Sequence, residues 1–80
     1  MTVAQAELDR PMRIVGFGSL HEDQCSRLSS FGLFQGASVT KLLRTPLLDP
    51  VECLVGAQLV VLDAWVLEHI VVDEEARSHV

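Results

Sequence analysis

Two side chains with metal-binding potential, those of His21 and Cys25, lie four positions apart in a stretch with helical periodicity. An imidazole and a thiolate one helical turn apart can both reach a cation such as Zn²⁺ or Fe²⁺. Structural zinc sites take four ligands, however, and the sequence has no second half of such a motif. We therefore favour a packing role for this pair, assign no metal ligand and no required cofactor, and keep binding of a divalent transition metal as an alternative.

No known catalytic motif is found in the sequence. A P-loop needs G-x-x-x-x-G-K-[ST], and neither Gly16-Phe17-Gly18 nor the Gly32 to Gly36 segment has the Lys and the hydroxyl residue that contact phosphate and magnesium. The three histidines and eleven acidic residues are scattered along the chain, and no Ser, Cys or Lys lies in a recognisable nucleophile motif. The sequence therefore predicts a protein that is not an enzyme.

The remaining cysteine, aromatic and histidine residues favour structural roles. Two cysteines are too few for a disulfide scaffold, so we expect Cys25 and Cys53 to be buried thiols. The four aromatic residues do not suggest a groove for proline-rich peptides. We expect Trp65 to cover one end of the core and His69 to face solvent at the edge of a strand.

Length, charge and hydropathy restrict the class of protein. A chain of 80 residues with 49% hydrophobic and 21% charged residues is a single small globular domain. The net charge is −5, and no cluster of Lys and Arg is present, so nucleic-acid binding is not expected. The N-terminus lacks a signal sequence, and the longest apolar stretch, 54–67, is too short to cross a bilayer. We therefore expect a cytoplasmic protein without direct membrane insertion.

Hydrophobic periodicity predicts five short strands and one helix. The helix is expected to begin at Leu20, where Ser19 and Glu22 match a capping box, and to stop at Gly32. Residues 63–67 are expected to form one tight turn. The predicted strands cover residues 12–17, 37–44, 51–55, 60–62 and 70–72.

The predicted elements suggest a mainly β domain with one helix inserted after the first strand. Five short strands in about 60 residues suggest a small, strongly bent sheet or barrel, because closure removes exposed sheet edges. Residues 1–11 are expected to form a flexible leader before the domain at 12–73, and residues 74–80 an acidic tail that frays.

Several segments between Met12 and Glu74 resemble the FeoA family, the small ferrous iron transport protein A. The most specific segment is the loop with Pro46-Leu47 and Asp49-Pro50 at a fixed distance from Gly36. The other segments are Arg13-Ile14-Val15-Gly16-Phe17, Arg27-Leu28, Phe31-Gly32-Leu33, Leu43-Arg44-Thr45, Val51-Glu52 and Glu68-His69-Ile70-Val71-Val72. The resemblance implies an SH3-like five-stranded β-barrel. It also implies a non-enzymatic accessory role in ferrous iron uptake, as a protein-interaction module for the cytosolic G domain of a FeoB-type membrane transporter.

The loop 45–50 is the candidate partner-binding site. We expect the contact residues to be Leu47, Leu48, Asp49 and Pro50, because two exposed leucines in a proline-bracketed loop lower solubility unless a partner covers them. Alternatively, Leu47 or Leu48 folds back and fills one end of the barrel.

Two other functions remain open from the sequence. The first is a metal-responsive regulatory module, related to the SH3-like domain of iron-dependent repressors, that binds Fe²⁺ or Zn²⁺ through groups such as His21. The second is a homodimer joined by strand edges.

Overall fold

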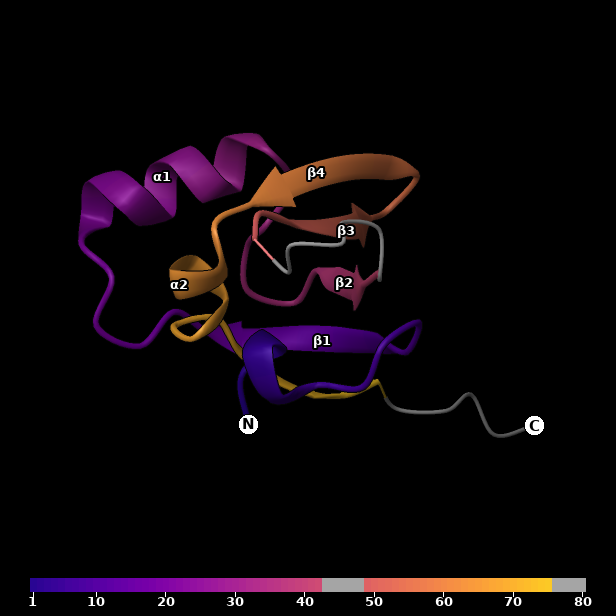
Figure 1. The fold of residues 1–80 in the computed structure, drawn as a ribbon. Helices are drawn as coiled ribbons and strands as arrows, with labels where there is room; N and C mark the ends of the chain where they lie inside the picture. Colours follow the sequence, from indigo (N-terminus) through magenta and orange to yellow (C-terminus); the bar gives the residue numbers. More distant parts are fainter. Residues whose placement is uncertain (43–48, 76–80) are drawn as a thin grey trace.

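The computed structural model describes residues 1–42 and 49–75, which form one antiparallel sheet with two α-helices and a short 3-10 helix, η1 (Figure 1). The five strands are ordered β4-β3-β2-β1-β5. The elements are η1 (Val3–Gln5), β1 (Pro11–Gly16), α1 (Glu22–Ser30), β2 (Ser38–Lys41), β3 (Val51–Val55), β4 (Gln58–Leu62), α2 (Ala64–Leu67) and β5 (Val71–Glu74).

The expected fold class is confirmed, because the chain is mainly β and its one long helix follows the first strand. Each strand alternates between the core and the outer face, as period-2 patterning requires. In β1, Met12 and Ile14 are buried while Arg13 and Val15 are exposed. In β4, Val60 and Leu62 are buried and their neighbours face outward. The core therefore lies on one face of the sheet.

The expected closure of the sheet into a barrel is not found. Strands β4 and β5 occupy the two ends of the strand order, and within residues 1–42 and 49–75 they do not pair with each other. One physical reason is that the outer side of β5 already has a partner. Thr2 forms an isolated bridge with Val71, and the Val72 amide donates to the Met1 carbonyl at 2.8 Å.

The first residues of the chain differ from the expected flexible leader. Val3 is 1% exposed, and Ala6, one turn later, is also buried in the core. The Val3 amide donates to the Ile70 carbonyl at 2.9 Å, so the segment is fixed by both packing and backbone hydrogen bonds. The apolar residues here are few and polar residues follow them, so hydrophobic periodicity predicts no packed element, and the expectation of a flexible leader does not match the structure.

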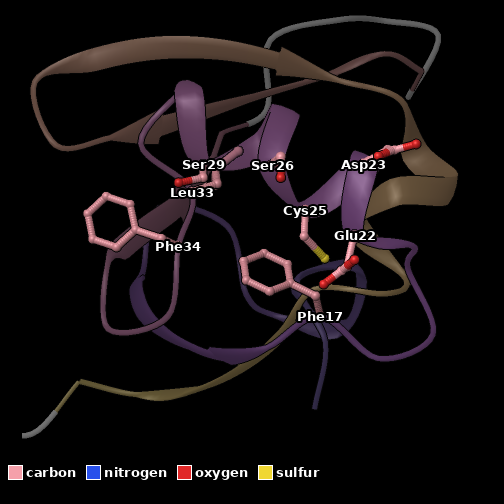
Figure 2. Close-up of a pocket in the computed structure, with 8 residues that line it drawn as sticks. All are labelled: Phe17, Glu22, Asp23, Cys25, Ser26, Ser29, Leu33 and Phe34. Carbon is pink, nitrogen blue, oxygen red and sulfur yellow. The ribbon is translucent and has the colours of Figure 1, made fainter.

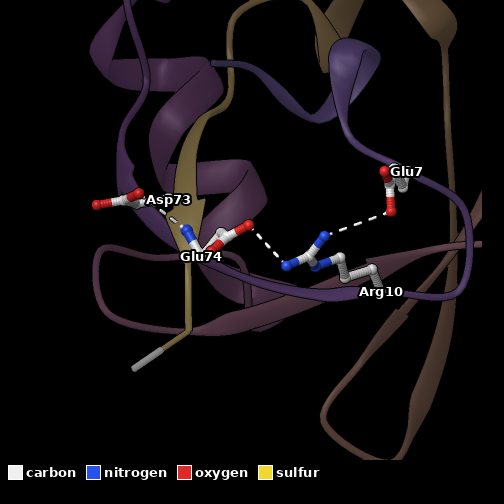
Figure 3. Close-up of polar contacts among 4 residues, drawn as sticks. All are labelled: Glu7, Arg10, Asp73 and Glu74. Carbon is white, nitrogen blue, oxygen red and sulfur yellow. Dashed lines mark hydrogen bonds and ion pairs between the residues drawn. The ribbon is translucent and has the colours of Figure 1, made fainter. Parts of the chain in front are cut away.

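An ion-pair network connects the start of β1 with the end of β5 (Figure 3). The Arg10 guanidinium lies between two carboxylates, 2.6 Å from Glu74 and 3.4 Å from Glu7. All three side chains are largely exposed, so each pair contributes at most about 1 kcal/mol. Strand β5 extends to Glu74, two residues beyond the strand expected from the sequence, and residues 76–80 of the predicted tail lie outside the described part.

Helix α1 begins at Glu22, two residues later than expected. The predicted capping box at Ser19 and Glu22 is not formed, because Ser19 Oγ lies 3.3 Å from Nδ1 of His69. Instead His21 is the N-cap residue, and its amide donates to Oε1 of Gln24 at 2.9 Å. The first orphan amide is thus satisfied by a side chain three residues later, which is one half of a capping box.

The end of α1 agrees with the sequence. Gly32 has a φ of 90°, a left-handed conformation that favours glycine. Its amide donates to the Ser29 carbonyl at 3.0 Å, and the Leu33 amide donates to the Leu28 carbonyl at 2.9 Å. These two bonds form a Schellman motif, and the buried side chains of Leu28 and Leu33 provide its apolar contact. The motif therefore directs the chain from the helix back into the core.

Candidate functional site

A groove lies between α1, the end of β4 and α2. Its volume is about 320 Å³, and most of its lining is apolar. We call it the α1–α2 groove. In Figure 1 the single turn of α2 lies below α1 and follows directly from β4. The lining residues are Leu20, Gln24, Arg27, Leu28, Phe31, Pro50, Val61, Leu62, Asp63, Trp65 and Val66.

Three large apolar side chains of this groove are exposed. Val61 is 57% exposed, Trp65 48% and Phe31 43%. Phe31 is the C-cap residue, just beyond the last residue of α1. Trp65 does not cover the core as predicted, because its side chain is exposed and is not among those packed against the core cluster. Contiguous apolar surface of this kind is typical of interaction sites.

The two described residues of the predicted partner-binding loop are at this groove. Pro50 lines it, and Asp49 accepts a hydrogen bond from the Ala64 amide through Oδ1 at 2.9 Å. That amide is the first of α2, so Asp49 satisfies an otherwise orphan helix donor and joins the loop to the turn that carries Trp65. Leu47 and Leu48 lie outside the described residues.

The sequence suggested that His69 faces solvent at the edge of a strand, but its side chain is half-buried. It precedes β5, and its ring packs edge-on against Trp65 with a centroid distance of 6.2 Å. Its Nδ1 lies 3.3 Å from Ser19 Oγ, a contact between residues 50 positions apart in the chain. His69 therefore packs against Trp65, four positions earlier, whereas its contact with Ser19 is one that sequence periodicity does not indicate.

A second cavity, of about 520 Å³, lies on the opposite side of α1 (Figure 2). Figure 2 shows the sulfur of Cys25 near the ring of Phe17 and the carboxylate of Glu22, whereas Phe34 lies at the other end. Cys25 Sγ is 3.9 Å from the Leu20 carbonyl, and the thiol is half-buried. This environment is that of a packed thiol beside an aromatic ring.

The structure does not bring a metal-ligand set together around the candidate pair. His21 is exposed at the N-cap and does not line the cavity that contains Cys25. In the part of the chain that the structure describes, no three His, Cys, Asp or Glu residues are grouped so that they could hold a metal ion. Two ligands alone form a weak site.

The environment of Cys53 disfavours its reactive thiolate form. It is fully buried in β3, and burial raises the pKa of its thiol from 9.0 to about 11, while nearby Lys41 partly opposes the shift. Because the thiolate is the form that attacks electrophiles and binds metals, burial disfavours both roles for Cys53 at neutral pH.

No helix in residues 1–42 and 49–75 is long and apolar enough to span a membrane. The longest, α1, has nine residues.

Solved structures of similar fold cover almost the whole chain. The solution NMR structure of FeoA protein from Chlorobium tepidum has a TM-score of 0.84 at 23% identity, over 99% of this chain and 74% of that one. The crystal structure of Stenotrophomonas maltophilia FeoA complexed with zinc, described as a unique procaryotic SH3 domain protein, has a TM-score of 0.73 at 24% identity, over 91% and 89%. These similarities establish the SH3-like fold.

A third structure is the solution structure of iron(II) transport protein A from Clostridium thermocellum. It has a TM-score of 0.80 at 23% identity, over 92% of this chain. This chain spans only 45% of the length of that protein. No curated protein sequence gave a significant match.

A family model, the FeoA domain, matches residues 1–74, which include the N-terminal segment as well as all five strands. The match extends over both the groove and the sheet, and it agrees with the fold of the solved FeoA structures. The chain therefore belongs to the FeoA family.

Proposed function

We propose that this protein is a non-enzymatic accessory factor of ferrous iron uptake that docks on the cytosolic G domain of a FeoB-type membrane transporter. The contact consists of Leu47, Leu48, Asp49 and Pro50 together with the α1–α2 groove. Because the G domain of such a transporter is cytosolic, the proposal also places this protein in the cytoplasm. The observation that carries the proposal is the half-exposed Trp65 beside Pro50 in one apolar groove.

The family membership supports a role in iron transport, and the groove suggests how a partner is held. Tryptophan is among the residues that contribute most to binding free energy when a partner covers it. Trp65 lies on a single helical turn whose first amide is bound by Asp49, and Pro50 lines the groove with it, so Asp49, Pro50 and the tryptophan lie close together. Arg27 and Asp63 line the same groove and provide charges of both signs at its rim.

Co-purification with the cytosolic domain of the transporter tests this proposal. Leu48→Asp and Trp65→Ala are expected to lower the affinity at least about tenfold, a loss of about 1.4 kcal/mol, without changing the far-ultraviolet circular dichroism spectrum. Phe34→Ala is the matched control, because Phe34 is a similarly exposed aromatic residue that lines the other cavity. Undiminished binding of both Leu48→Asp and Trp65→Ala would contradict the proposed site.

A metal-responsive regulatory module is the second candidate function. The zinc complex of the S. maltophilia protein favours it, and the exposed imidazole of His21 is the ligand that the sequence suggested. Titration with Zn²⁺ or Fe²⁺ separates the two candidates. A docking module binds these ions weakly, and His21→Ala leaves the affinity unchanged, whereas tight stoichiometric binding that is lost in His21→Ala establishes metal response.

A further inference from the structure

The two edges of the sheet are protected to very different degrees. The outer side of β5 is covered by the N-terminal segment, through the Thr2–Val71 bridge and the Val3–Ile70 and Met1–Val72 hydrogen bonds. It also carries the charged residues Asp73 and Glu74. At the other end of the strand order, no described residue pairs with the outer side of β4.

Strand β4 lacks the usual protection of a sheet edge. Natural edge strands carry charged residues, proline or a bulge, which prevent pairing with another chain. Residues Gln58–Leu62 include none of these, and the pairing of β4 with β3 is regular along its whole length. Leu59 is 60% exposed and Val61 57% exposed on the outer face. This edge is therefore available for pairing.

The register of β4 with β3 identifies its free backbone groups. A tight loop of Gly56 and Ala57 joins the strands, so Val55 and Gln58 form the first hydrogen-bonded pair of the hairpin. Hydrogen-bonded pairs alternate along an antiparallel ladder, so Val60 and Leu62 also bond to β3. The N–H and C=O groups of Leu59 and Val61 consequently point to the outer side.

We propose that β4 pairs antiparallel with β4 of a second copy of this chain, about a two-fold axis that passes beside Val60. In this register Leu59 faces Val61 of the second copy, and the two residues exchange backbone hydrogen bonds. Both side chains are on the outer face, so each exposed leucine packs against a valine across the seam. The pairing joins the two sheets into one continuous sheet.

The charges of the chain are compatible with this seam, although the net charge of −5 opposes self-association in general. On the neighbouring strand β3, the acidic residue Glu52 faces Val61. The two copies of Glu52 are three strand spacings apart, at least about 14 Å, whereas the Debye length at physiological salt is about 8 Å. Asp63 faces Ala57 of the second copy, so no two acids oppose each other.

The size of the seam determines the expected strength of the dimer. Two five-residue strands bury less than the total of about 1,200 Å² that is typical of stable complexes. We therefore expect a dissociation constant of about 10–100 μM. The seam uses the β4 backbone with Leu59 and Val61, and Val61 also lines the α1–α2 groove. Leu59 does not line the groove, whereas transporter docking depends on Trp65 and residues 47–50, so Leu59→Glu and Trp65→Ala test the two proposals separately.

Sedimentation equilibrium of the 80-residue chain from about 10 μM to about 1 mM, with amide hydrogen exchange by NMR, tests the dimer. The expected result is a mass that doubles with concentration, accompanied by protection of the Leu59 and Val61 amides. Leu59→Glu is expected to weaken association at least about tenfold. Leu8→Glu, which adds the same charge at an exposed leucine outside the sheet, is the matched control and is expected to dimerise normally.

Three results would overturn the proposal. One is a wild-type chain that stays monomeric throughout this range. In that case the β4 edge would be a site for an extended segment of another protein. The second is a dimer in which the Leu59 and Val61 amides remain unprotected. The third is a Leu59→Glu variant that folds and dimerises as the wild type does. The amide measurement needs only the wild-type chain, so it decides the question even if Leu59→Glu does not fold.

Discussion

Single residues of the groove depend on contacts with residues from several parts of the sequence. Trp65 is supported on one side by His69, which in turn contacts Ser19, and the turn that carries it is held by Asp49. None of these partners is adjacent to Trp65 in the chain. A half-exposed tryptophan on a one-turn helix would lose rotational freedom on binding, and these contacts reduce that cost because they restrict its helix and its ring beforehand.

Cys53 allows a prediction about pH. Its pKa is about 11 in the folded state and 9.0 without burial, so above about pH 9 the unfolded chain loses this proton first. The stabilisation from the neutral buried thiol is therefore complete below about pH 9 and is lost as the pH rises toward about 11.

Urea unfolding across this pH range measures the effect. Wild type and Cys25→Ser are expected to lose stability in parallel, and Cys53→Ala is expected to lose less, relative to its own value at neutral pH. Equal slopes for Cys53→Ala and wild type would show that Cys53 does not cause the decline.

At the scale of elements, turns and caps fix where the helix ends and the chain returns to the sheet. Gly32 and Gly36 both have positive φ angles, of 90° and 95°. An added Cβ at Gly32 would lie 3.2 Å from Cγ1 of Val55, whereas at Gly36 it would meet no atom within 4 Å. The two positions therefore separate backbone strain from steric contact with β3.

Alanine substitution at these glycines is expected to destabilise the protein to different degrees. Gly36→Ala is expected to cost about 1–2 kcal/mol through backbone strain alone. Gly32→Ala is expected to cost more, because the Schellman motif is strained and Val55 must also move. Thermal or urea unfolding of both variants gives the comparison, and an equal loss would mean that Val55 adjusts freely.

At the scale of the whole molecule, the N-terminal segment and β4 have opposite roles. The segment from Met1 to Ala6 covers one edge of the sheet and fills part of the core, whereas the other edge remains without a partner among the described residues. The open strand order is thus completed on one side by the chain itself. On the other side, we infer that a second copy completes it.

Val3 tests the contribution of this segment. Val3→Ala is expected to lower the free energy of unfolding by about 1–3 kcal/mol, because it removes buried methyl groups and leaves a small cavity. Leu8→Ala, which shortens a partly exposed side chain of the same region, is expected to change it by less than about 0.5–1 kcal/mol. A Val3→Ala variant as stable as the wild type would indicate that the segment is not part of the folded core.

The sequence by itself determined the elements that depend on local pattern. Alternation gave the strands, and Gly32 gave the end of α1, because residues a few positions apart decide burial and left-handed backbone conformation. The FeoA-like segments also indicated the family before the fold was considered. The role of Leu47 and Leu48 stays a prediction, since both lie outside the described residues.

Only the tertiary structure decided which elements cover one another. Periodicity shows that a face is apolar, but it does not show what packs against that face. For this reason periodicity did not predict that His21 rather than Ser19 is the N-cap residue, or that the N-terminal segment bridges to β5. It also did not predict that the sheet is open rather than closed into a barrel. In the groove, Pro50 and Trp65 lie beside residues of α1. These segments are distant in the sequence, so only the packing of the whole fold determines that they meet.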